Sequence, residues 1–99
     1  MFDNYQNCLI KMKSLEEFTH YDENMRGIKE KRTFQLRETY NADYCIYSYK
    51  TIICFVDLTK HIYCITPYQY STTTSKQLSY IRVASATWDK YGLKRILWI

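Results

Sequence analysis

Two stretches of the chain have the apolar spacing of an amphipathic helix, and they stand on either side of a group of predicted strands. The first runs from residue 3 to about 20, and Asp3 or Asn4 can cap it. Its apolar side chains recur every three or four positions: Tyr5, Cys8, Leu9, Met12, Leu15 and Phe18. The second runs from about Ser75 to Tyr91 and stops at Gly92. Its inner face has the same spacing: Leu78, Ile81, Ala84, Ser85 and Trp88.

The segments around the second helix predict strands. Residues 32–40 alternate between apolar and polar side chains, which is typical of a half-buried strand. A polar turn at 41–43 then leads to a second strand at 44–49. After the second helix, residues 93–99 close the chain as a further strand.

A central hairpin is the most apolar part of the pattern. The runs 51–56 and 61–66 flank a short polar connection in which Leu58 and Thr59 are the expected turn residues. This register places four side chains on one face: Ile53, Phe55, Ile62 and Cys64. The opposite face then carries Ile52, Cys54, Val56, His61, Tyr63 and Ile65. Strands of this kind lie centrally in a sheet, with helices on one side and the second side partly covered or used for binding.

The predicted fold is a single α+β domain. It has a mostly antiparallel sheet of four to five strands, packed by the C-terminal helix, with an N-terminal helix in addition. The 99 residues suffice for one core. Residues 19–31 lose the apolar pattern and contain Gly27, so we expect a loop there, between a helix at 1–20 and a compact core at 32–99. The N-terminal helix belongs to that core or is a segment that docks on a partner.

Composition adds one unusual feature, an excess of tyrosine. The chain has 11 tyrosines, 46% apolar and 24% charged residues, and a net charge of +4. Tyrosine combines a large apolar face with a polar tip, which suits interfaces and base stacking, although an AT-rich genome produces the same excess. The mild positive charge permits binding to an acidic surface. No apolar run long enough to span a membrane and no secretory signal is present, so we expect a cytoplasmic protein.

The residues of chemical interest do not form a catalytic pattern. The four cysteines, Cys8, Cys45, Cys54 and Cys64, lack metal-ligand spacing, so we expect free thiols that behave as small apolar residues. His20 is expected to be a lone surface residue in the loop and His61 begins a strand, with no nucleophile signature nearby. No glycine-rich phosphate loop is present. The sequence therefore predicts a protein that is not an enzyme, with no catalytic residues, no metal and no cofactor.

A run of five hydroxyl residues, Ser71 to Ser75, followed by Lys76, joins the central hairpin to the second helix. Two interpretations stay open for this run. Thr74 or Ser75 caps the helix, which we favour. Alternatively, the helix start and its hydroxyl groups bind an anion.

Tyrosines and basic residues interleave through the middle of the chain, which predicts a binding surface. Aromatic side chains amid positive charge on a sheet face are typical of proteins that bind single-stranded nucleic acid. No RNA-recognition motif is present, however, and Glu38 and Asp43 interrupt the pattern. The same surface serves a protein partner equally well. The candidate partner-binding residues are Tyr47, Tyr49, Lys50, Tyr68, Tyr70, Lys76, Tyr80 and Arg82.

The centre of the chain also resembles a group of small phage-encoded proteins of uncharacterised function. The matching residues are Tyr47-Ser-Tyr-Lys-Thr-Ile-Ile-Cys-Phe55, Ile62-Tyr63 and Tyr70-Ser-Thr-Thr-Thr-Ser-Lys-Gln-Leu-Ser-Tyr-Ile81, within about residues 44–82. The N-terminal helix lies outside this match, and Leu78 stands near a position where those proteins have a polar residue. The resemblance implies an accessory protein of a phage or mobile element, at work in the cytoplasm of a bacterial host.

Small phage proteins without catalytic motifs often act by binding host machinery, and anti-CRISPR inhibitors are the best-known class. The resemblance therefore implies a non-enzymatic inhibitor that binds a bacterial defence effector, such as a Cas nuclease or its nucleic-acid complex. The alternative from the residues is a module that binds single-stranded nucleic acid. A structural or regulatory phage protein, which predicts a stable homo-oligomer, is a third hypothesis.

Overall fold

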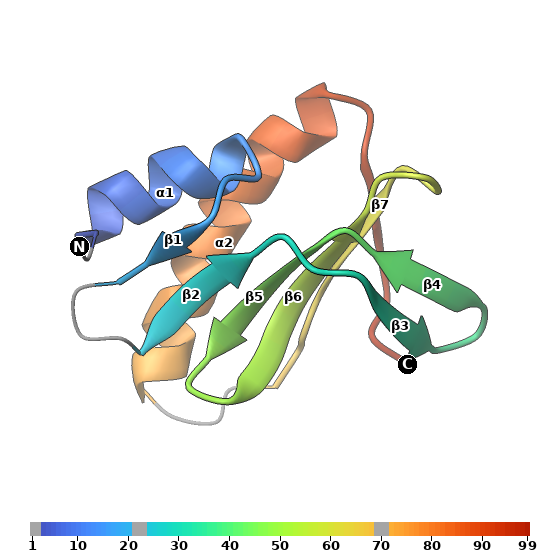
Figure 1. Ribbon diagram of the computed structural model, residues 1–99, viewed down its shortest axis with the longest axis horizontal. Helices are drawn as coiled ribbons and strands as arrows, with labels where there is room; N and C mark the ends of the chain where they lie inside the picture. The colour runs from blue at the N-terminus through green and yellow to red at the C-terminus, as the bar shows by residue number, and fades with distance from the viewer. Residues whose placement is uncertain (1–2, 21–23, 69–71) are drawn as a thin grey trace.

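A computed structural model describes residues 3–20, 24–68 and 72–99 and has two layers, with both helices on one face of a sheet (Figure 1). The helices and strands follow one another in this order: α1 (Tyr5–Lys13), β1 (Phe18–Thr19), β2 (Met25–Ile28), β3 (Arg32–Gln35), β4 (Thr39–Ala42), β5 (Tyr44–Ser48), β6 (Thr51–Asp57), β7 (Ile62–Ile65), α2 (Thr72–Lys90) and β8 (Lys94–Ile96). No helix in these three ranges is both long and apolar enough to cross a membrane.

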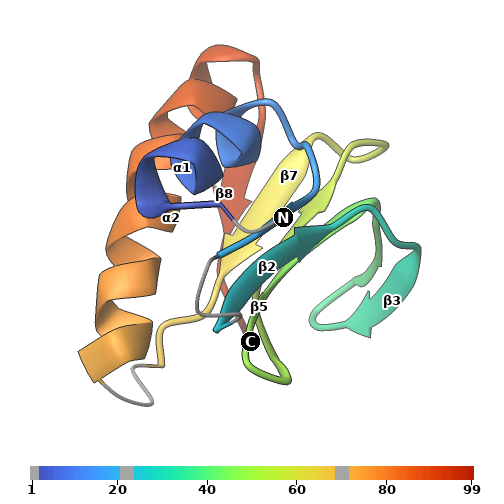
Figure 2. The same ribbon diagram turned by 60° about the vertical axis from the view of Figure 1, so that its left-hand side comes forward.

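The main sheet has six strands in the order β1-β2-β5-β6-β7-β8. Its neighbours are antiparallel except for β7 and β8, which are parallel because α2 connects them. Strands β3 and β4 form a separate two-stranded sheet that stands away from the helices (Figure 2). The predicted α+β class is confirmed, with a larger sheet than the four to five strands expected.

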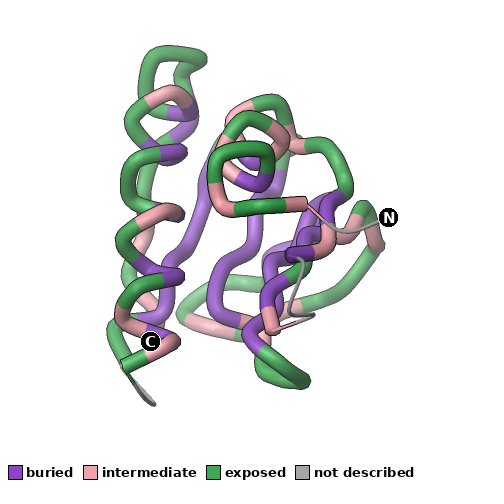
Figure 3. Tube along the Cα trace, turned by 90° about the vertical axis from the view of Figure 1, so that its left-hand side faces the viewer, coloured by how far each residue is buried: buried purple, intermediate pink, exposed green. Residues whose placement is uncertain are grey.

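The helix layer covers one face of the sheet and forms the larger core. The inner face predicted for α2 is buried at all five positions, and Figure 3 shows the buried positions of both helices turned toward the strands. The indole Nε1 of Trp88 donates a hydrogen bond of 3.0 Å to the buried carbonyl of Met12. Cys8 and Met12 are fully buried, so α1 is part of the core rather than a detachable segment.

Gly92 ends α2 as predicted. Its φ of 91° lies in the left-handed region, and its N–H donates to the carbonyl of Asp89 at 3.1 Å. The N–H of Leu93 donates to the carbonyl of Trp88, also at 3.1 Å. These two bonds make a Schellman motif, which satisfies carbonyl groups that the helix leaves open.

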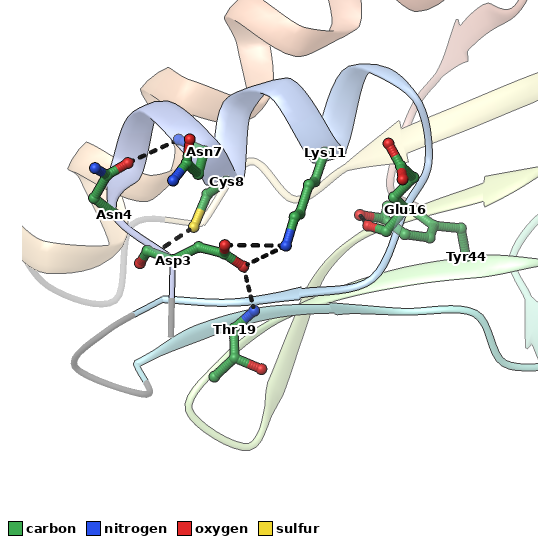
Figure 4. Close-up of polar contacts among 8 residues, drawn as sticks. All are labelled: Asp3, Asn4, Asn7, Cys8, Lys11, Glu16, Thr19 and Tyr44. Carbon is green, nitrogen blue, oxygen red and sulfur yellow. Dashed lines mark hydrogen bonds and ion pairs between the residues drawn. The ribbon is translucent and has the colours of Figure 1, made fainter. Parts of the chain in front are cut away.

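Asn4 caps α1, one of the two caps expected. Its side chain accepts a hydrogen bond of 2.8 Å from the N–H of Asn7 (Figure 4). The other candidate, Asp3, instead forms an ion pair of 3.0 Å with Lys11 and accepts a bond of 3.4 Å from the N–H of Thr19. Asp3 therefore joins the start of α1 to its middle and to β1.

The second face of the sheet is covered by the β3–β4 hairpin and the end of the chain. The ring of Phe34 stacks on Phe55 with centroids 4.1 Å apart, and Trp98 packs against Phe55 at 5.8 Å. These contacts form a second, smaller core. Little of this face is therefore left for a binding partner.

The N-terminal helix is shorter than predicted, since α1 ends at Lys13 and Phe18 belongs to β1. Leu15 has a φ of 56°, and the N–H of Glu16 bonds back to the carbonyl of Lys11 at 2.8 Å. The chain thus leaves the helix at residues 14–15. Phe18 is buried in the core, so its apolar spacing does not distinguish a helix from a strand.

The loop predicted at 19–31 contains strand β2, which pairs with β5 from Met25↔Ser48 to Ile28↔Cys45. Gly27 lies in this strand because the chain packs closely there. A Cβ atom at this position would collide with the ring of Phe18 and with the hydroxyl of Tyr44. The pattern hides this strand because a glycine occupies one of its inward positions.

Several smaller predictions also need correction. The single strand expected at 32–40 is divided between β3 and β4. Residues 41 and 42, expected in a turn, belong to β4, and the strand expected at 93–99 is limited to β8. In the central hairpin the turn is residues 58–61 rather than Leu58 and Thr59 alone, so His61 lies in the turn and not at a strand start. The predicted faces are right for the strand residues from Cys54 onward, but Ile52 and Ile53 are exchanged. A β-bulge causes this, because Ile46 pairs with Cys54 while Tyr47 pairs with Ile52.

Candidate partner-binding surface

Four of the predicted site residues come from segments that lie at one end of the molecule. Tyr49 and Lys50 form the β5–β6 turn, Tyr68 follows β7, and Lys76 lies near the start of α2. Figures 1 and 2 both place these segments at the end opposite the β6–β7 turn, and Figure 2 shows the β5–β6 turn set apart from the start of α2. Tyr49 and Tyr68 are 61% and 57% exposed, so the surface offers two accessible tyrosine rings.

The carbonyl of Asn24 holds this end of the molecule together. It accepts a hydrogen bond of 3.0 Å from the N–H of Tyr49 and one of 2.9 Å from Nε2 of Gln77. The β5–β6 turn and the first turns of α2 are therefore fixed to the same atom. The backbone that carries their exposed side chains is held in place as a result.

Lys76 and Tyr80 belong to an aromatic cluster that the sequence did not reveal. Nζ of Lys76 lies 4.7 Å from the centre of the Tyr5 ring, and Tyr5 stacks on Tyr80 at 4.6 Å with an angle of 8° between the rings. The ring of His20 lies 3.9 Å from Tyr5. Because His20 is buried, its predicted role as a lone surface residue is wrong. We call the set Tyr5, Tyr49, Lys50, Tyr68, Lys76 and Tyr80 the tyrosine–lysine surface.

Tyr47 does not belong to this surface, because it is only 7% exposed. Its hydroxyl donates to Glu30 and accepts a bond of 3.3 Å from Arg32, and Arg26 lies 4.8 Å above its ring. Burial raises the pKa of Tyr47, and the hydrogen bond to Glu30 raises it further. The segment that leads into β3 therefore covers the side chain that was expected to contact a partner.

The last two predicted site residues give no support to a continuous patch. Tyr70 lies outside the described residues. Arg82 is exposed on α2 but follows Lys76 by six positions. At roughly 100° per residue it therefore faces a different side of the helix from Lys76 and Tyr80.

The hydroxyl run enters the helix earlier than predicted. Since α2 begins at Thr72, Thr74 and Ser75 lie inside its first turn, and the prediction that one of them caps the helix is wrong. Thr74 is buried, and the carbonyl of Ser75 accepts a bond of 3.1 Å from the hydroxyl of Ser79. Ser71 lies outside the described residues.

The cysteines and the potential metal ligands are the remaining groups of chemical interest in the described part of the chain. All four cysteines are free and buried, as predicted. Burial raises the pKa of Cys8, Cys45 and Cys64 to about 12 and that of Cys54 well above its ordinary value. These thiols are therefore protonated and poor nucleophiles at neutral pH. No group of three or more potential metal ligands occurs within residues 3–20, 24–68 and 72–99.

A comparison with known protein families finds one that matches most of the chain. Residues 1–91 match a family of unknown function, DUF8033. The chain belongs to that family. The DUF8033 match covers every described helix and strand except β8. It therefore includes the N-terminal helix, which lies outside the resemblance over residues 44–82. No curated protein and no solved structure matches the chain.

Proposed function

We propose that this protein is a non-enzymatic binding protein whose tyrosine–lysine surface docks on a macromolecular partner. The observation that carries the proposal is the convergence of Tyr49 and Lys50 with the start of α2 at the carbonyl of Asn24. Tyrosine has little conformational entropy to lose when it is immobilised at an interface. Two exposed tyrosines and two lysines on fixed backbone thus form a pre-organised contact surface.

The partner that we propose is a bacterial defence effector, such as a Cas nuclease complex, which the protein inhibits in an anti-CRISPR manner. The support comes from the resemblance of residues 44–82 to small phage-encoded proteins. On this proposal the chain originates from a phage or mobile element and works in the cytoplasm of the bacterial host.

The charge of the chain restricts how it would inhibit. A protein that imitates nucleic acid needs a strongly acidic surface, whereas this chain has a net charge of +4 and lysines at the proposed contact. The proposed contact is therefore an acidic patch of the effector, or the phosphates of its bound nucleic acid.

A plasmid-interference assay tests this proposal in cells that carry one defence system at a time. Expression of the chain should restore transformation of a targeted plasmid for one system, and Tyr49→Ala combined with Lys50→Glu should abolish the effect. Leu97→Ala combined with Lys94→Glu, at exposed positions outside the surface, is the matched control. If every defence system stays active in the presence of the folded protein, the proposal fails.

A second candidate function is the binding of single-stranded nucleic acid at the same surface. The exposed rings of Tyr49 and Tyr68 beside Lys50 and Lys76 favour it, since aromatic rings stack on unpaired bases and lysines contact phosphates. The burial of Tyr47 weighs against the sheet-face platform first expected. A gel shift with single-stranded DNA or RNA that fades with added salt would favour this candidate. Light scattering would identify the homo-oligomer of the third hypothesis.

A further inference from the structure

A pair of apolar cavities lies at the other end of the molecule, where α1, α2 and β6 all end. The cavities have volumes of about 310 and 350 Å³, and Leu15 and Leu58 line both of them. Tyr44 lines the first cavity, and Trp88 and Tyr91 line the second. We call these two cavities and their shared leucine wall the leucine groove. It shares no residue with the tyrosine–lysine surface.

The leucine groove is accessible rather than part of the core. Leu58 is 44% exposed and Tyr91 is 75% exposed, although both are large side chains with apolar faces. Leu93, which lines the same cavity as Tyr91, is buried. Accessible apolar side chains that border cavities on fixed backbone are the usual anchor sites of protein interfaces.

The backbone around the groove is held in an unfavourable conformation. Among the described residues, three that are not glycine have a positive φ, and two of them, Leu15 and His61 at 56°, line the groove. A leucine rarely adopts this conformation, because its Cβ approaches the following carbonyl. Hydrogen bonds from Leu15 N–H to Met12 and from Glu16 N–H to Lys11 hold it. Strain of this kind is concentrated at functional sites, and here it keeps Leu15 between the two cavities.

The charges at the rim favour an acidic occupant. The two acids that line the groove are already engaged: Asp43 accepts bonds from Lys31 and from Leu58 N–H, and Glu30 accepts one from the hydroxyl of Tyr47. Lys13 and Lys29 also line it and form no ion pair within the described ranges. The rim therefore has three lysines, Lys13, Lys29 and Lys31, against two acids, and this excess of positive charge favours a ligand with carboxylates.

We propose that the leucine groove binds an acidic amphipathic helix of a protein partner. Two apolar side chains four positions apart lie on one face of such a helix, about 6 Å apart. One would enter each cavity, with the Leu15–Leu58 wall between them, and carboxylates beside them would reach Lys13 and Lys29. A second copy of the chain is a poor occupant, because α1 has no acidic residue and α2 has only Asp89.

Fluorescence anisotropy with a designed peptide tests the proposal on the intact chain. The probe is a labelled peptide of about fifteen alanine and glutamate residues with two leucines four positions apart, long enough to form helix. It should bind, and Leu58→Glu should weaken the binding at least about tenfold, since it puts a negative charge at the shared wall. Tyr91→Ala, at an exposed site, is the second variant and should also weaken the binding. Leu97→Ala, at an exposed site outside both the groove and the tyrosine–lysine surface, is the matched control and should leave the affinity unchanged.

Two changes to the probe separate the proposed mode from simple charge attraction. A peptide with lysine in place of glutamate, and one with a central proline that breaks the helix, should each bind at least about tenfold more weakly. Backbone chemical shifts should move at Leu15, Leu58 and Tyr91 on binding. The proposal is overturned by the absence of binding, by binding that neither variant weakens, or by a dimer of the chain that Leu58→Glu dissociates.

Discussion

Gln77 donates a hydrogen bond of 2.9 Å from its side-chain amide to the backbone carbonyl of Asn24, across 53 positions of sequence. The donor is shielded from water, since Gln77 is fully buried. The same carbonyl also accepts from Tyr49, so this one bond fixes the start of α2 relative to the β5–β6 turn. The proposed tyrosine–lysine surface depends on this contact for its shape.

Replacement of Gln77 should therefore affect stability first and the surface second. Gln77→Ala should lower the free energy of unfolding by about 1 to 3 kcal/mol, because it removes the donor to Asn24 and leaves a small cavity. The amide oxygen Oε1 has no hydrogen-bond partner among the described residues, so its loss costs nothing. Urea denaturation gives the free energy. Gln77→Glu should cost more, since it buries a charge, and Arg82→Ala on the exposed face of α2 is the neutral control.

The two glycines should respond differently to the same substitution. Gly27→Ala should cost about 3 kcal/mol, because the new methyl group collides with Phe18 and Tyr44 in a packed core. Gly92→Ala should cost only about 1 kcal/mol, which is the penalty for a side chain at a φ of 91° in open space. Thermal or urea unfolding of both variants measures the difference. Equal losses would mean that the Phe18–Gly27 contact is looser than described.

This contrast also explains what the sequence could and could not predict. The inner face of α2 is recognisable because the five predicted positions, all of them buried, keep one period along a long helix. Strand β2 is not, because its inward position at Gly27 has no side chain, and the reason for the glycine lies in Phe18 and Tyr44. Tertiary contacts, rather than local preference, decide that segment.

The candidate sites also combine features that the sequence predicts with features that depend on tertiary packing. Lys76 and Tyr80 are one helical turn apart, so the sequence suffices to place them on one side of α2. Their contact with Tyr5 depends on how α1 packs on α2, which no local pattern shows. The leucine groove is harder still to predict from the sequence, because Leu15, Leu58 and Tyr91 come from three separate connections between helices and strands. Their positions become related only when the core has formed.

The cysteines should resist modification while the protein is folded. With the pKa of Cys8, Cys45 and Cys64 raised to about 12 by burial, almost no thiolate exists at pH 8. A thiol reagent such as Ellman's reagent should react with all four cysteines in urea, and in native buffer only as fast as the protein opens. Fast reaction of a single cysteine in native buffer would contradict its burial, and Cys→Ser variants would identify which one.

The pH dependence of stability should include a contribution from Asp43. The hydrogen bond from Lys31 lowers the pKa of Asp43, and the bond from Leu58 N–H adds to this against the opposing effect of burial. A carboxyl group with a lowered pKa in the folded state stabilises the fold above its ordinary value, near pH 4, and loses this contribution as the pH falls through the lowered value. Asp43→Asn should therefore reduce the urea midpoint at pH 7 but leave it nearly unchanged at about pH 2. Glu16→Gln, at an exposed position, is the control for the loss of one negative charge. An equal effect of Asp43→Asn at both pH values would show that the substitution destabilises the fold for a reason other than charge, such as altered packing of the turn at Leu58.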